Sequence, residues 1–268
     1  MYKEVPWRLI RSLSNKKERD RTGLTVAEGP SVVLAALERN VKVLAVILSE
    51  DFAETLKGRR IREAFARYPE ECQLFVVSKE MYRKMSDTKS PQGAMCLLPF
   101  PFQFLGGQPP PVWECPLYVI GIDIQDPANV ASLIRSGAAA GADSVILTGL
   151  SADPFGPKVI RSSAGSIFAT EVLFHNDPIG LLEHLRCSGV LLVKALPKGG
   201  VTPWECNFTG DSAVLLGNEA RGLRPEILDL PGEDVTIPMP GGIESLNVAM
   251  AASVLLYEAV RQRTSLNK

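Results

Sequence analysis

Hydrophobic residues in the first hundred positions follow two alternating patterns. Short runs rich in β-branched and other apolar residues predict strands, and longer stretches with helical spacing predict helices. The expected strands are 24–28, 43–48, 74–77 and 94–98, and the expected helices are 30–39 and 51–68. Strands that alternate with helices indicate a small α/β domain.

The second half of the chain is dominated by short, continuous apolar runs. Such runs are typical of strands in a parallel sheet that is covered on both faces, and they lie at 117–123, 144–148, 190–196, 213–216 and 234–237. Apolar residues at helical spacing predict one helix over 129–140 and a last helix over 245–263. In the last helix we expect one buried stripe, formed by Leu246, Met250, Val254 and Tyr257.

A proline-rich segment at 99–116 separates the two patterns. Proline cannot donate a backbone hydrogen bond and disfavours helix at the residue before it, so we interpret this segment as a linker. The predicted organisation is therefore a small domain over 1–98, a linker over 99–116 and a second α/β domain over 117–268.

Composition narrows the class of protein. The 268 residues are 46% hydrophobic and 22% charged, which is a globular composition. No run reaches the ~18 apolar residues of a membrane helix, and the start of the chain lacks the apolar stretch of a signal peptide. Five cysteines without a CxxC pair and only two histidines argue against a disulfide scaffold or a metal site. We expect a reducing, cytoplasmic location.

Charge is unevenly distributed although the net charge is −1. Residues 1–100 contain 18 Lys and Arg against 13 Asp and Glu, a net of +5, which leaves −6 for the rest. A basic end can contact a polyanion, but a solvated helix face is the simpler explanation of the charge alone. The candidates for phosphate contacts are Arg11, Lys16, Lys17, Arg19 and Arg21.

Several common catalytic motifs are absent from the sequence. There is no GxGxxG after a strand, no GxxxxGK[ST] and no GxSxG. Their absence argues against a classical dinucleotide site, a P-loop and a Ser-His-Asp triad. The carboxylates of Asp123 and Asp126 follow a predicted strand, where turn and cap roles are their simpler interpretation.

Three polar segments each follow a predicted strand and precede a helical pattern. They read DPANVASLIRSG at 126–137, LGNEARGL at 216–223 and IPMPGGIESLN at 237–247. In an open α/β sheet such loops gather at the carboxyl ends of the strands, where ligands bind. Each segment alone is typical of a turn, but three with Asn, Arg, Glu and Ser among them indicate a site.

In this order, the three segments resemble the signature motifs of the SpoU (TrmH-like) family of RNA ribose 2′-O-methyltransferases, in the SPOUT superfamily. DPFGPKVIRSSAGSIF at 153–168 resembles the family's connecting segment, and the match spans 117–263. RSLSNKKERDRTGLTVAEGPSVVLAAL at 11–37 and MSDTKSPQGAMCLLP at 85–99 resemble its N-terminal substrate-binding domain. The resemblance implies a small N-terminal α/β sandwich and a C-terminal parallel-sheet α/β domain with a trefoil knot, an exception to the rule against knots.

The resemblance also implies a cofactor and partners. These are S-adenosylmethionine bound in the knot, RNA, and a second copy of the chain through the C-terminal domain, with no metal. The cofactor residues carried over from the motifs are Ala195, Leu196, Gly217, Ile237, Met239 and Leu246. Glu28 and Gly29 match the substrate-binding domain's pattern and are RNA-contact candidates, although a strand-to-helix turn also explains them.

The catalytic residues implied by the resemblance are Asn129, Arg135, Glu219, Ser245 and Asn247. The resemblance gives Arg135 the role of activating the ribose hydroxyl. Because a guanidinium normally stays protonated and has no acceptor, two versions stay open. Arg135 is either a perturbed base helped by an RNA phosphate, or a phosphate clamp that stabilises developing negative charge, which we favour. Asn129 and Ser245 are alternatively helix N-caps.

We therefore expect a methyltransferase that acts on a ribose 2′-hydroxyl of structured RNA, with large-subunit ribosomal RNA favoured over tRNA. Ala131 and Ala220 stand where the family pattern has glycine. They motivate an alternative, a non-catalytic RNA-binding or ribosome-assembly factor that keeps the fold. A different α/β transferase with a small substrate is the third hypothesis.

Overall fold

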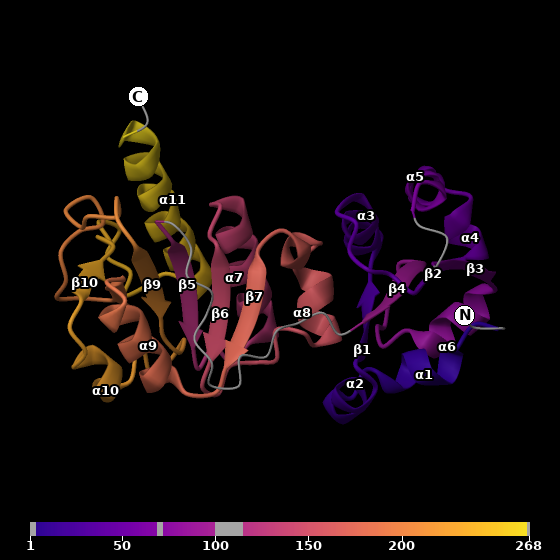
Figure 1. Ribbon diagram of the computed structural model, residues 1–268, viewed down its shortest axis with the longest axis horizontal. Coiled ribbons are helices and arrows are strands. Elements are labelled where there is room, and N and C mark those ends of the chain that lie inside the picture. Colours follow the sequence, from indigo (N-terminus) through magenta and orange to yellow (C-terminus); the bar gives the residue numbers. More distant parts are fainter. Residues whose placement is uncertain (1–3, 69–71, 100–114, 267–268) are drawn as a thin grey trace. The chain divides into compact units, whose positions relative to one another are not determined.

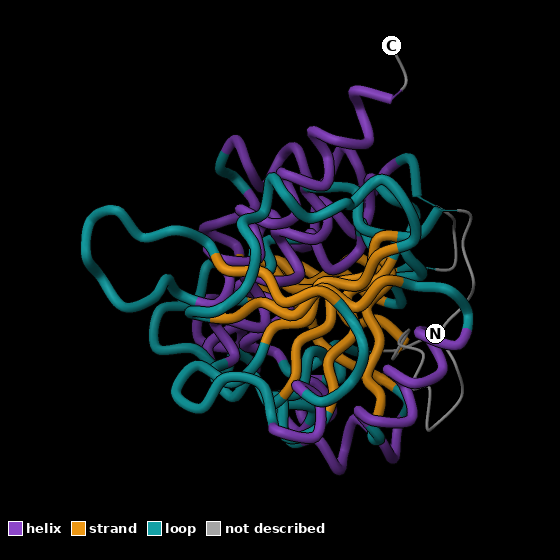
Figure 2. The backbone as a smooth tube through the Cα atoms, turned by 90° about the vertical axis from the view of Figure 1, so that its left-hand side faces the viewer, coloured by secondary structure: helices purple, strands orange, loops and turns teal. Residues whose placement is uncertain are grey.

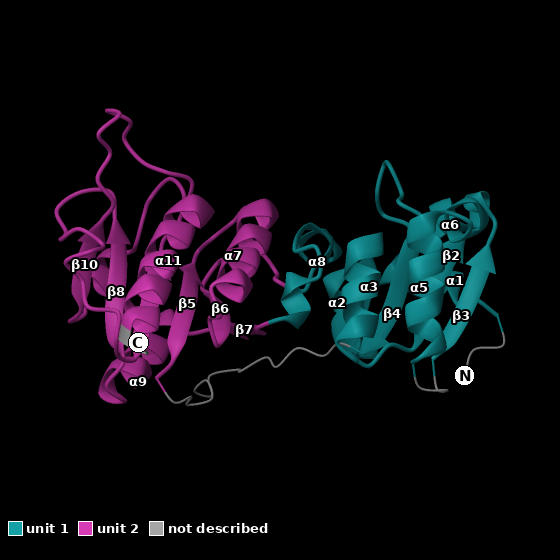
Figure 3. Ribbon diagram, turned by 90° about the horizontal axis from the view of Figure 1, so that it is seen from above, with its two compact units in different colours: residues 1–102, 155–169 teal, residues 103–154, 170–268 magenta. Residues whose placement is uncertain are grey.

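A computed structural model describes residues 4–68, 72–99 and 115–266, and the chain forms two compact units (Figure 3). Unit 1 combines residues 1–102 with 155–169, and unit 2 combines 103–154 with 170–268. The segment 155–169 interrupts unit 2 in the sequence but packs as part of unit 1. Most of the predicted linker, 100–114, lies outside the described residues.

Unit 1 is built on a mixed sheet with the strand order β1-β4-β2-β3 (Figure 1). β4 runs antiparallel to both β1 and β2, whereas β2 and β3 are parallel. The four strands match the expected ones to within two residues at each end, and they are β1 Leu24–Glu28, β2 Ala45–Ser49, β3 Gln73–Val77 and β4 Ala94–Pro99.

The helices of unit 1 lie on both faces of this sheet (Figure 1). They are α1 Trp7–Ser12, α2 Lys16–Thr22, α3 Pro30–Glu38, α4 Glu50–Ala53, α5 Leu56–Ala66, α6 Lys79–Met85, α8 Pro157–Ser162 and the 3-10 turn η1 Ser166–Phe168. α1 and α6 bury Ile10, Leu13, Tyr82 and Met85 against apolar strand residues. The sandwich implied by the resemblance is therefore present.

The helix expected over 51–68 is two helices. Thr55 has an extended backbone, and its hydroxyl accepts the amide hydrogen of Gly58, so it caps α5 and ends α4. A Cβ at Gly58 would lie 2.2 Å from the carbonyl oxygen of Phe52, so the tight bend requires glycine there. The apolar spacing predicted helical residues correctly but did not reveal the cap.

Unit 2 is built on six parallel strands in the order β10-β8-β9-β5-β6-β7. The strands are β5 Leu117–Ile122, β6 Ser144–Thr148, β7 Glu171–His175, β8 Leu191–Leu196, β9 Ser212–Leu216 and β10 Glu233–Thr236. β7 was not expected from the sequence. It is a short edge strand that begins with Glu171 and ends with His175, so its apolar run has only three residues.

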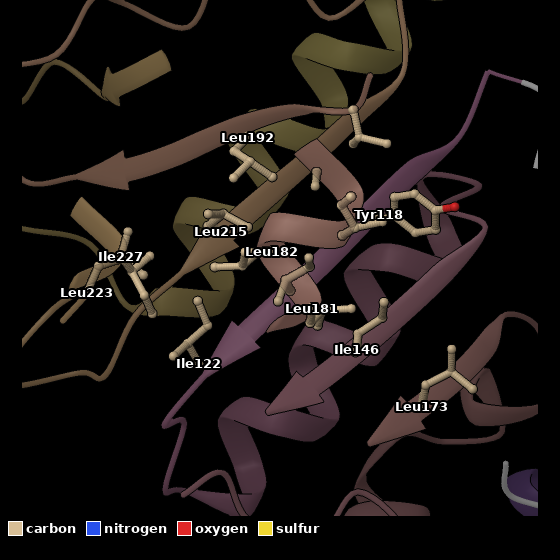
Figure 4. Packing of buried hydrophobic residues seen from close by; sticks show 14 residues of the cluster. Tyr118, Ile122, Ile146, Leu173, Leu181, Leu182, Leu192, Leu215, Leu223 and Ile227 are labelled. Carbon is tan, nitrogen blue, oxygen red and sulfur yellow. The ribbon is translucent and has the colours of Figure 1, made fainter. Parts of the chain in front are cut away.

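Helices cover both faces of the unit 2 sheet (Figure 2). They are α7 Pro127–Ala139, α9 Pro178–Cys187, α10 Pro225–Leu228 and α11 Val248–Leu266. On one face Leu181, Leu182 and Ile227 pack with Ile122 and Leu215 of the strands (Figure 4). α7 and α11 pack against each other and against the sheet.

The last helix buries a different face from the predicted one. Met250, Val254 and Tyr257 are 62%, 41% and 55% exposed, and Leu246 precedes the helix. The buried face is formed by Ala249, Ala252, Leu255, Leu256 and Ala259. Small residues on this face let α11 approach α7 closely, and the hydroxyls of Ser253 and Ser136 lie 2.8 Å apart. The helical spacing of apolar residues was predicted correctly. However, the helix has two apolar stripes, and the stripe that was expected to be buried is the exposed one.

Candidate active site

The three polar segments follow β5, β9 and β10, so they lie at the carboxyl edge of one parallel sheet. β5 and β9 are neighbours, and the strand order reverses between them. From β5 the chain continues to β6 and β7 on one side, whereas β8, β9 and β10 lie on the other. Such a switch point is where open α/β sheets bind ligands.

One side-chain amide joins all three motifs. The Nδ2 of Asn129, on α7, donates to the Oε1 of Glu219 at 2.8 Å. The Oδ1 of Asn129 accepts from the Nδ2 of Asn247 at 2.9 Å. Because an ionised carboxylate can only accept, Glu219 fixes which end of the Asn129 amide faces it. We call this hydrogen-bonded set the amide chain.

The ends of two helices hold the amide chain in place. Asp126 caps α7, since its carboxylate accepts the amide hydrogen of Ala128 at 2.9 Å, and this leaves the side chain of Asn129 for Glu219. Asn247 caps α11 through a 2.9 Å bond from the amide nitrogen of Ala249. The alternative cap roles of Asn129 and Ser245 are therefore wrong, because each cap is another residue.

Arg135 and Ser245 stay outside the amide chain. Arg135 lies six residues after Asn129 on α7, and its exposed guanidinium has no hydrogen-bond or ion-pair partner within the described ranges. Ser245 is exposed in the loop before α11, and its hydroxyl likewise has no partner in the described part of the chain. Both keep their full hydrogen-bonding capacity for a ligand.

The sequence did not reveal an ion pair, between Arg224 and Asp123, that supports the loops of the amide chain. Arg224 binds the carboxylate of Asp123 with two nitrogens, at 2.5 and 2.6 Å, and holds its pKa below the ordinary value. Asp123 has a φ of +59° and also accepts the amide hydrogen of Leu150 at 2.6 Å. A Cβ at Gly149 would lie 2.3 Å from the Asp123 carboxylate. The pair therefore ties together the loops after β5, β6 and β9.

Asn218 connects this ion pair to Glu219. Its Nδ2 donates to the carbonyl oxygen of Asp123 at 2.9 Å, and its Oδ1 accepts the amide hydrogens of Ala220 and Arg221. Asn218 stands in the second motif and could have been singled out there. Nothing in the sequence pattern relates Arg224 to Asp123, 101 positions earlier.

The two alanines that replace glycine in the motifs do not strain the backbone. Ala220 is not among the described non-glycine residues with a positive φ, so its methyl group meets no conformational penalty. Ala131 lies buried inside α7, where alanine is a better helix former than glycine.

The cofactor residues carried over from the motifs gather at neighbouring strand ends. Ala195 and Leu196 end β8, Gly217 follows β9 and Ile237 follows β10, and all four are half-buried. Met239 and Leu246 are half-buried in the loop between β10 and α11. The three strands are adjacent in the order β10-β8-β9.

Backbone approaches backbone very closely in this region. A Cβ at Gly217 would lie 2.3 Å from the carbonyl carbon of Gly222, and one at Gly200 would lie 2.4 Å from the carbonyl oxygen of Asp234. Half-buried loop backbone at adjacent strand ends can cradle an adenine through amide and carbonyl groups. These residues therefore fit a nucleoside cofactor such as S-adenosylmethionine.

Replacing Gly217 by alanine is expected to displace this loop. The added methyl group cannot avoid the Gly222 backbone, so we expect the free energy of unfolding to fall by about 1–3 kcal/mol and cofactor binding to weaken. Urea unfolding and titration calorimetry measure the two effects. The matched control is G210A, because no atom lies within 4 Å of a Cβ at Gly210. Equal stability and binding in both variants would contradict the expectation.

The predicted phosphate contacts divide into exposed and buried side chains. Lys16, Lys17 and Arg21 are exposed on α2, where Arg21 pairs with Glu18 at 2.6 Å. Arg11 is exposed and donates to the carbonyl oxygen of Ser86. Arg19 corrects the prediction: it is 2% exposed, and its guanidinium donates to two carbonyl oxygens. Burial therefore makes Arg19 a structural residue.

Glu28 is also buried and cannot contact RNA directly in this structure. It is 3% exposed, and its carboxylate accepts from the hydroxyl of Ser86 at 2.7 Å. Burial raises its pKa. Gly29 has a φ of +126° at the start of α3, so it is the strand-to-helix turn that was its simpler interpretation.

Among the described residues, no helix is both long and apolar enough to cross a bilayer. Within the same ranges, no three side chains of His, Cys, Asp or Glu gather in a way that could hold a metal ion.

Comparison with known proteins places this geometry in a family. Residues 116–257 match the SpoU rRNA Methylase family, and residues 8–96 match the MRM3-like substrate binding domain. The chain belongs to the SpoU rRNA methylase family. This SpoU protein is 37% identical, over 95% of its length and 90% of the relative's, to an uncharacterized tRNA/rRNA methyltransferase of Synechocystis sp.. It is 28% identical, over 92% of both chains, to the 23S rRNA (guanosine(2553)-2′-O)-methyltransferase RlmP of Bacillus subtilis.

Solved structures of other SpoU proteins have the same fold. The methyltransferase AviRb from Streptomyces viridochromogenes, in complex with the cofactor AdoMet (S-adenosylmethionine), superposes with a TM-score of 0.82 at 28% identity, over 98% of this chain and 99% of AviRb. An AdoMet-bound rRNA methyltransferase from Sinorhizobium meliloti gives a TM-score of 0.79 at 28% identity, over 97% of this chain and 96% of that protein. The comparisons confirm the expected family, the α/β fold class and the methyltransferase class, and these relatives bind the expected cofactor.

Proposed function

We propose that this SpoU protein transfers a methyl group from S-adenosylmethionine to a ribose 2′-hydroxyl of structured RNA, with large-subunit ribosomal RNA favoured over tRNA. The observation that carries the proposal is the amide chain of Asn129, Glu219 and Asn247 at the switch point. Arg135 lies on the same helix as Asn129 and has no side-chain partner among the described residues. Full-length similarity to a 23S rRNA 2′-O-methyltransferase supports the substrate class.

The reaction is a direct displacement at carbon. When bound, S-adenosylmethionine supplies an electrophilic methyl group on a sulfonium. A carbon–oxygen bond forms as the carbon–sulfur bond breaks, and the hydroxyl proton leaves to solvent or to a phosphate. The attacking ribose oxygen, the methyl carbon and the sulfur must be in line, so correct positioning of the two substrates accounts for much of the rate enhancement.

The residues of this chain divide that work. The amide chain fixes the second and third motif loops relative to α7, and so fixes the site for the ribose. Arg135 clamps the phosphate next to the target ribose and stabilises the negative charge that develops on the attacking oxygen. Its guanidinium has no hydrogen-bond or ion-pair partner among the described residues, which leaves all five donors for RNA.

Loop backbone holds the cofactor in this proposal. Leu196, Gly217 and Ile237 end or follow three adjacent strands, where amide and carbonyl groups can bind an adenine. We also propose the trefoil knot that the family resemblance implies. The likeness of the fold to solved SpoU methyltransferases over nearly the whole chain supports it.

A second copy of the chain completes the proposed enzyme. Met250, Val254 and Tyr257 form an exposed apolar stripe on α11, next to the helix that carries Arg135. Apolar stripes of this kind mark interaction sites, and a homodimer through unit 2 would cover this one.

The double substitution V254E/Y257E is expected to give a monomer, because it places two charges in the proposed interface. Sedimentation or light scattering of the whole protein would show the change in mass. The control is L56E, since Leu56 is 85% exposed on α5. A wild-type monomer, or a double variant that remains a dimer, would contradict the homodimer.

A labelling experiment tests the reaction. The purified protein is incubated with methyl-labelled S-adenosylmethionine and, separately, total tRNA, ribosomal RNA from a host lacking this protein, and intact large subunits. Label in a 2′-O-methylnucleoside of ribosomal RNA supports the proposal, and label only in tRNA overturns the substrate preference. Cofactor and RNA binding without label in any pool would favour the non-catalytic assembly factor.

A further inference from the structure

Unit 1 contains two neighbouring hollows beside α6. The larger, about 510 Å³, lies between α1, α6 and the loop after α6, and the smaller is about 430 Å³. Arg83 and Lys89 line both, so the hollows share a wall. Their volumes lie in the range of small-ligand pockets, ~300–1,000 Å³.

The walls of these hollows carry uncompensated positive charge. Arg83 and Lys89 have no ion-pair or hydrogen-bond partner within the residues that the structure describes. Arg11, which lines the larger hollow, donates only to a neutral carbonyl. The one acidic residue in the wall of that hollow, Asp87, is paired with Arg161 at 3.0 Å. An anion entering the hollow would therefore meet free cations.

The buried carboxylate of Glu28 holds the wall of the larger hollow in place by hydrogen bonds. Glu28 accepts from the hydroxyls of Ser86 at 2.7 Å and Tyr82 at 3.4 Å. The Ser86 hydroxyl oxygen in turn accepts the amide hydrogen of Thr88 at 3.1 Å, and the Ser86 carbonyl accepts from Arg11. Glu28 thus holds the loop that carries Lys89. It is a positioning residue in unit 1, not an RNA contact.

An aromatic ring stands at the rim of the same hollow. Trp7 lines it, remains 36% exposed, and has the Arg8 guanidinium 5.1 Å from its ring centroid. Exposed aromatic rings next to free cations are the combination that single-stranded nucleic acids bind, with bases stacked on rings and phosphates on cations. The bases of a continuous RNA duplex are paired and stacked on one another, so they are not available to stack on such a ring.

We propose that this hollow holds an unpaired stretch of the RNA substrate, with a base stacked on Trp7 and phosphates on Arg11, Arg83 and Lys89. The inference rests on the proposed function for the identity of the polymer. It places the main RNA contact of unit 1 at α1, α6 and the loop after α6, rather than on the exposed basic face of α2.

Binding of a short single-stranded RNA tests the proposal directly. The whole protein is titrated, without S-adenosylmethionine, into a labelled oligouridine of about 12 nucleotides at several salt concentrations. The matched duplex is titrated in parallel. R83Q/K89Q is expected to weaken single-strand binding about tenfold and to lower the salt slope by about 1.4, since each phosphate contact contributes about 0.7.

Substitutions of Trp7 test base stacking separately from the phosphate contacts. W7A is expected to weaken binding by about 5- to 160-fold, the range for loss of one stacked base, with an unchanged salt slope. W7F keeps a ring and is expected to retain most of the affinity. Equal losses of RNA affinity in W7A and W7F would show that no base stacks on Trp7.

Two matched variants serve as controls. K57Q/R59Q removes two exposed cations from α5, and K16Q/K17Q removes two from α2. K57Q/R59Q is expected to bind like the wild type, and K16Q/K17Q, which tests the competing contact on α2, is expected to lose less affinity than R83Q/K89Q. If K16Q/K17Q loses affinity and R83Q/K89Q does not, the hollow is not the contact. Duplex binding as tight as single-strand binding would also overturn the proposal.

Methyl transfer separates this inference from the proposed function. If the enzyme methylates ribosomal RNA, R83Q/K89Q is expected to raise the KM for RNA about tenfold, with kcat and cofactor affinity unchanged. An unchanged KM would contradict the proposal that the hollow binds RNA, and it would leave the proposed methyltransferase function unaffected. If no RNA pool is methylated by the wild type, the function fails, and oligouridine binding still shows whether the hollow binds RNA.

Discussion

Replacing Arg135 by alanine is expected to lower kcat about 10²–10³-fold, the range for loss of one donor that stabilises transition-state charge. Fold and cofactor binding are expected to remain unchanged. The structural reason is that Arg135 is exposed and forms no hydrogen bond or ion pair within the described residues, so its removal leaves no group unsatisfied. Single-turnover methyl transfer, calorimetry with S-adenosylmethionine and thermal unfolding measure the three quantities.

The control for R135A is R186A. Arg186 is also an exposed helix arginine of unit 2, on α9, and among the described residues its guanidinium bonds only to the Cys187 sulfur, at 3.9 Å. We expect R186A to match the wild type in all three measurements. Wild-type turnover by R135A would remove this residue from the mechanism, and loss of cofactor binding would give it a different role.

R135K separates the two versions of the chemistry. A lysine keeps the charge but loses the planar fork that binds a phosphate with two donors, so a clamp predicts reduced activity with the wild-type pH profile. A base predicts that the profile moves, because the two side chains have different pKa values. A shifted pH profile in R135K would therefore contradict the clamp.

The second large effect is expected from N129D. This change replaces the Nδ2 donor by an oxygen, so two carboxylates face each other where Asn129 and Glu219 now share a 2.8 Å hydrogen bond. We expect kcat/KM at pH 8 to fall by about 10–100-fold, since two like charges ~4 Å apart repel by about 1 kcal/mol in water and about 4 kcal/mol near a protein surface. N129A loses both bonds and is expected to fall by a similar factor.

Acid is expected to rescue N129D but not N129A. Two facing carboxylates raise the pKa of one of them, so a proton taken up as the pH falls restores a donor between the two oxygens. The ratio of variant to wild-type activity should therefore rise between pH 8 and about pH 5 for N129D and stay constant for N129A. S132A, on the same helix, is the control, because in the described part of the chain the Ser132 hydroxyl bonds only to the Ala128 carbonyl. A flat ratio for N129D would mean that Glu219 does not need this donor.

Local patterns in the sequence determined most of the elements and brought the right segments together. Strand ends follow apolar runs, and the sequence alone predicts that the polar loops after β5, β9 and β10 lie at one edge of a parallel sheet. Asn129, Glu219 and Asn247 were expected to act together and do form a hydrogen-bonded chain. The strand ends and the loops that follow them depend on neighbours within a few residues, so a single sequence carries them. The two hydrogen bonds of the amide chain join residues 90 and 118 positions apart, and only the packed structure shows them.

Tertiary structure decided which face of a helix is buried, which side chains bond to each other and which charged residues are exposed. Tyr257 has the right period but lies on the exposed stripe of α11, because the helix packs its small residues against α7. Arg19 is as basic as its neighbours but is buried, and Glu28 supports a loop from below instead of meeting solvent.

The ion pair of Arg224 with Asp123 was decided in the same way, because its partners are separated by 101 positions. The same holds for the segment 155–169, which packs with unit 1. The periodicity of a segment depends on its own residues alone, whereas such contacts depend on how the whole chain packs. The sequence by itself thus determined the elements, the family motifs and the edge where the site lies, and only the packed structure decided the pairs that hold the site.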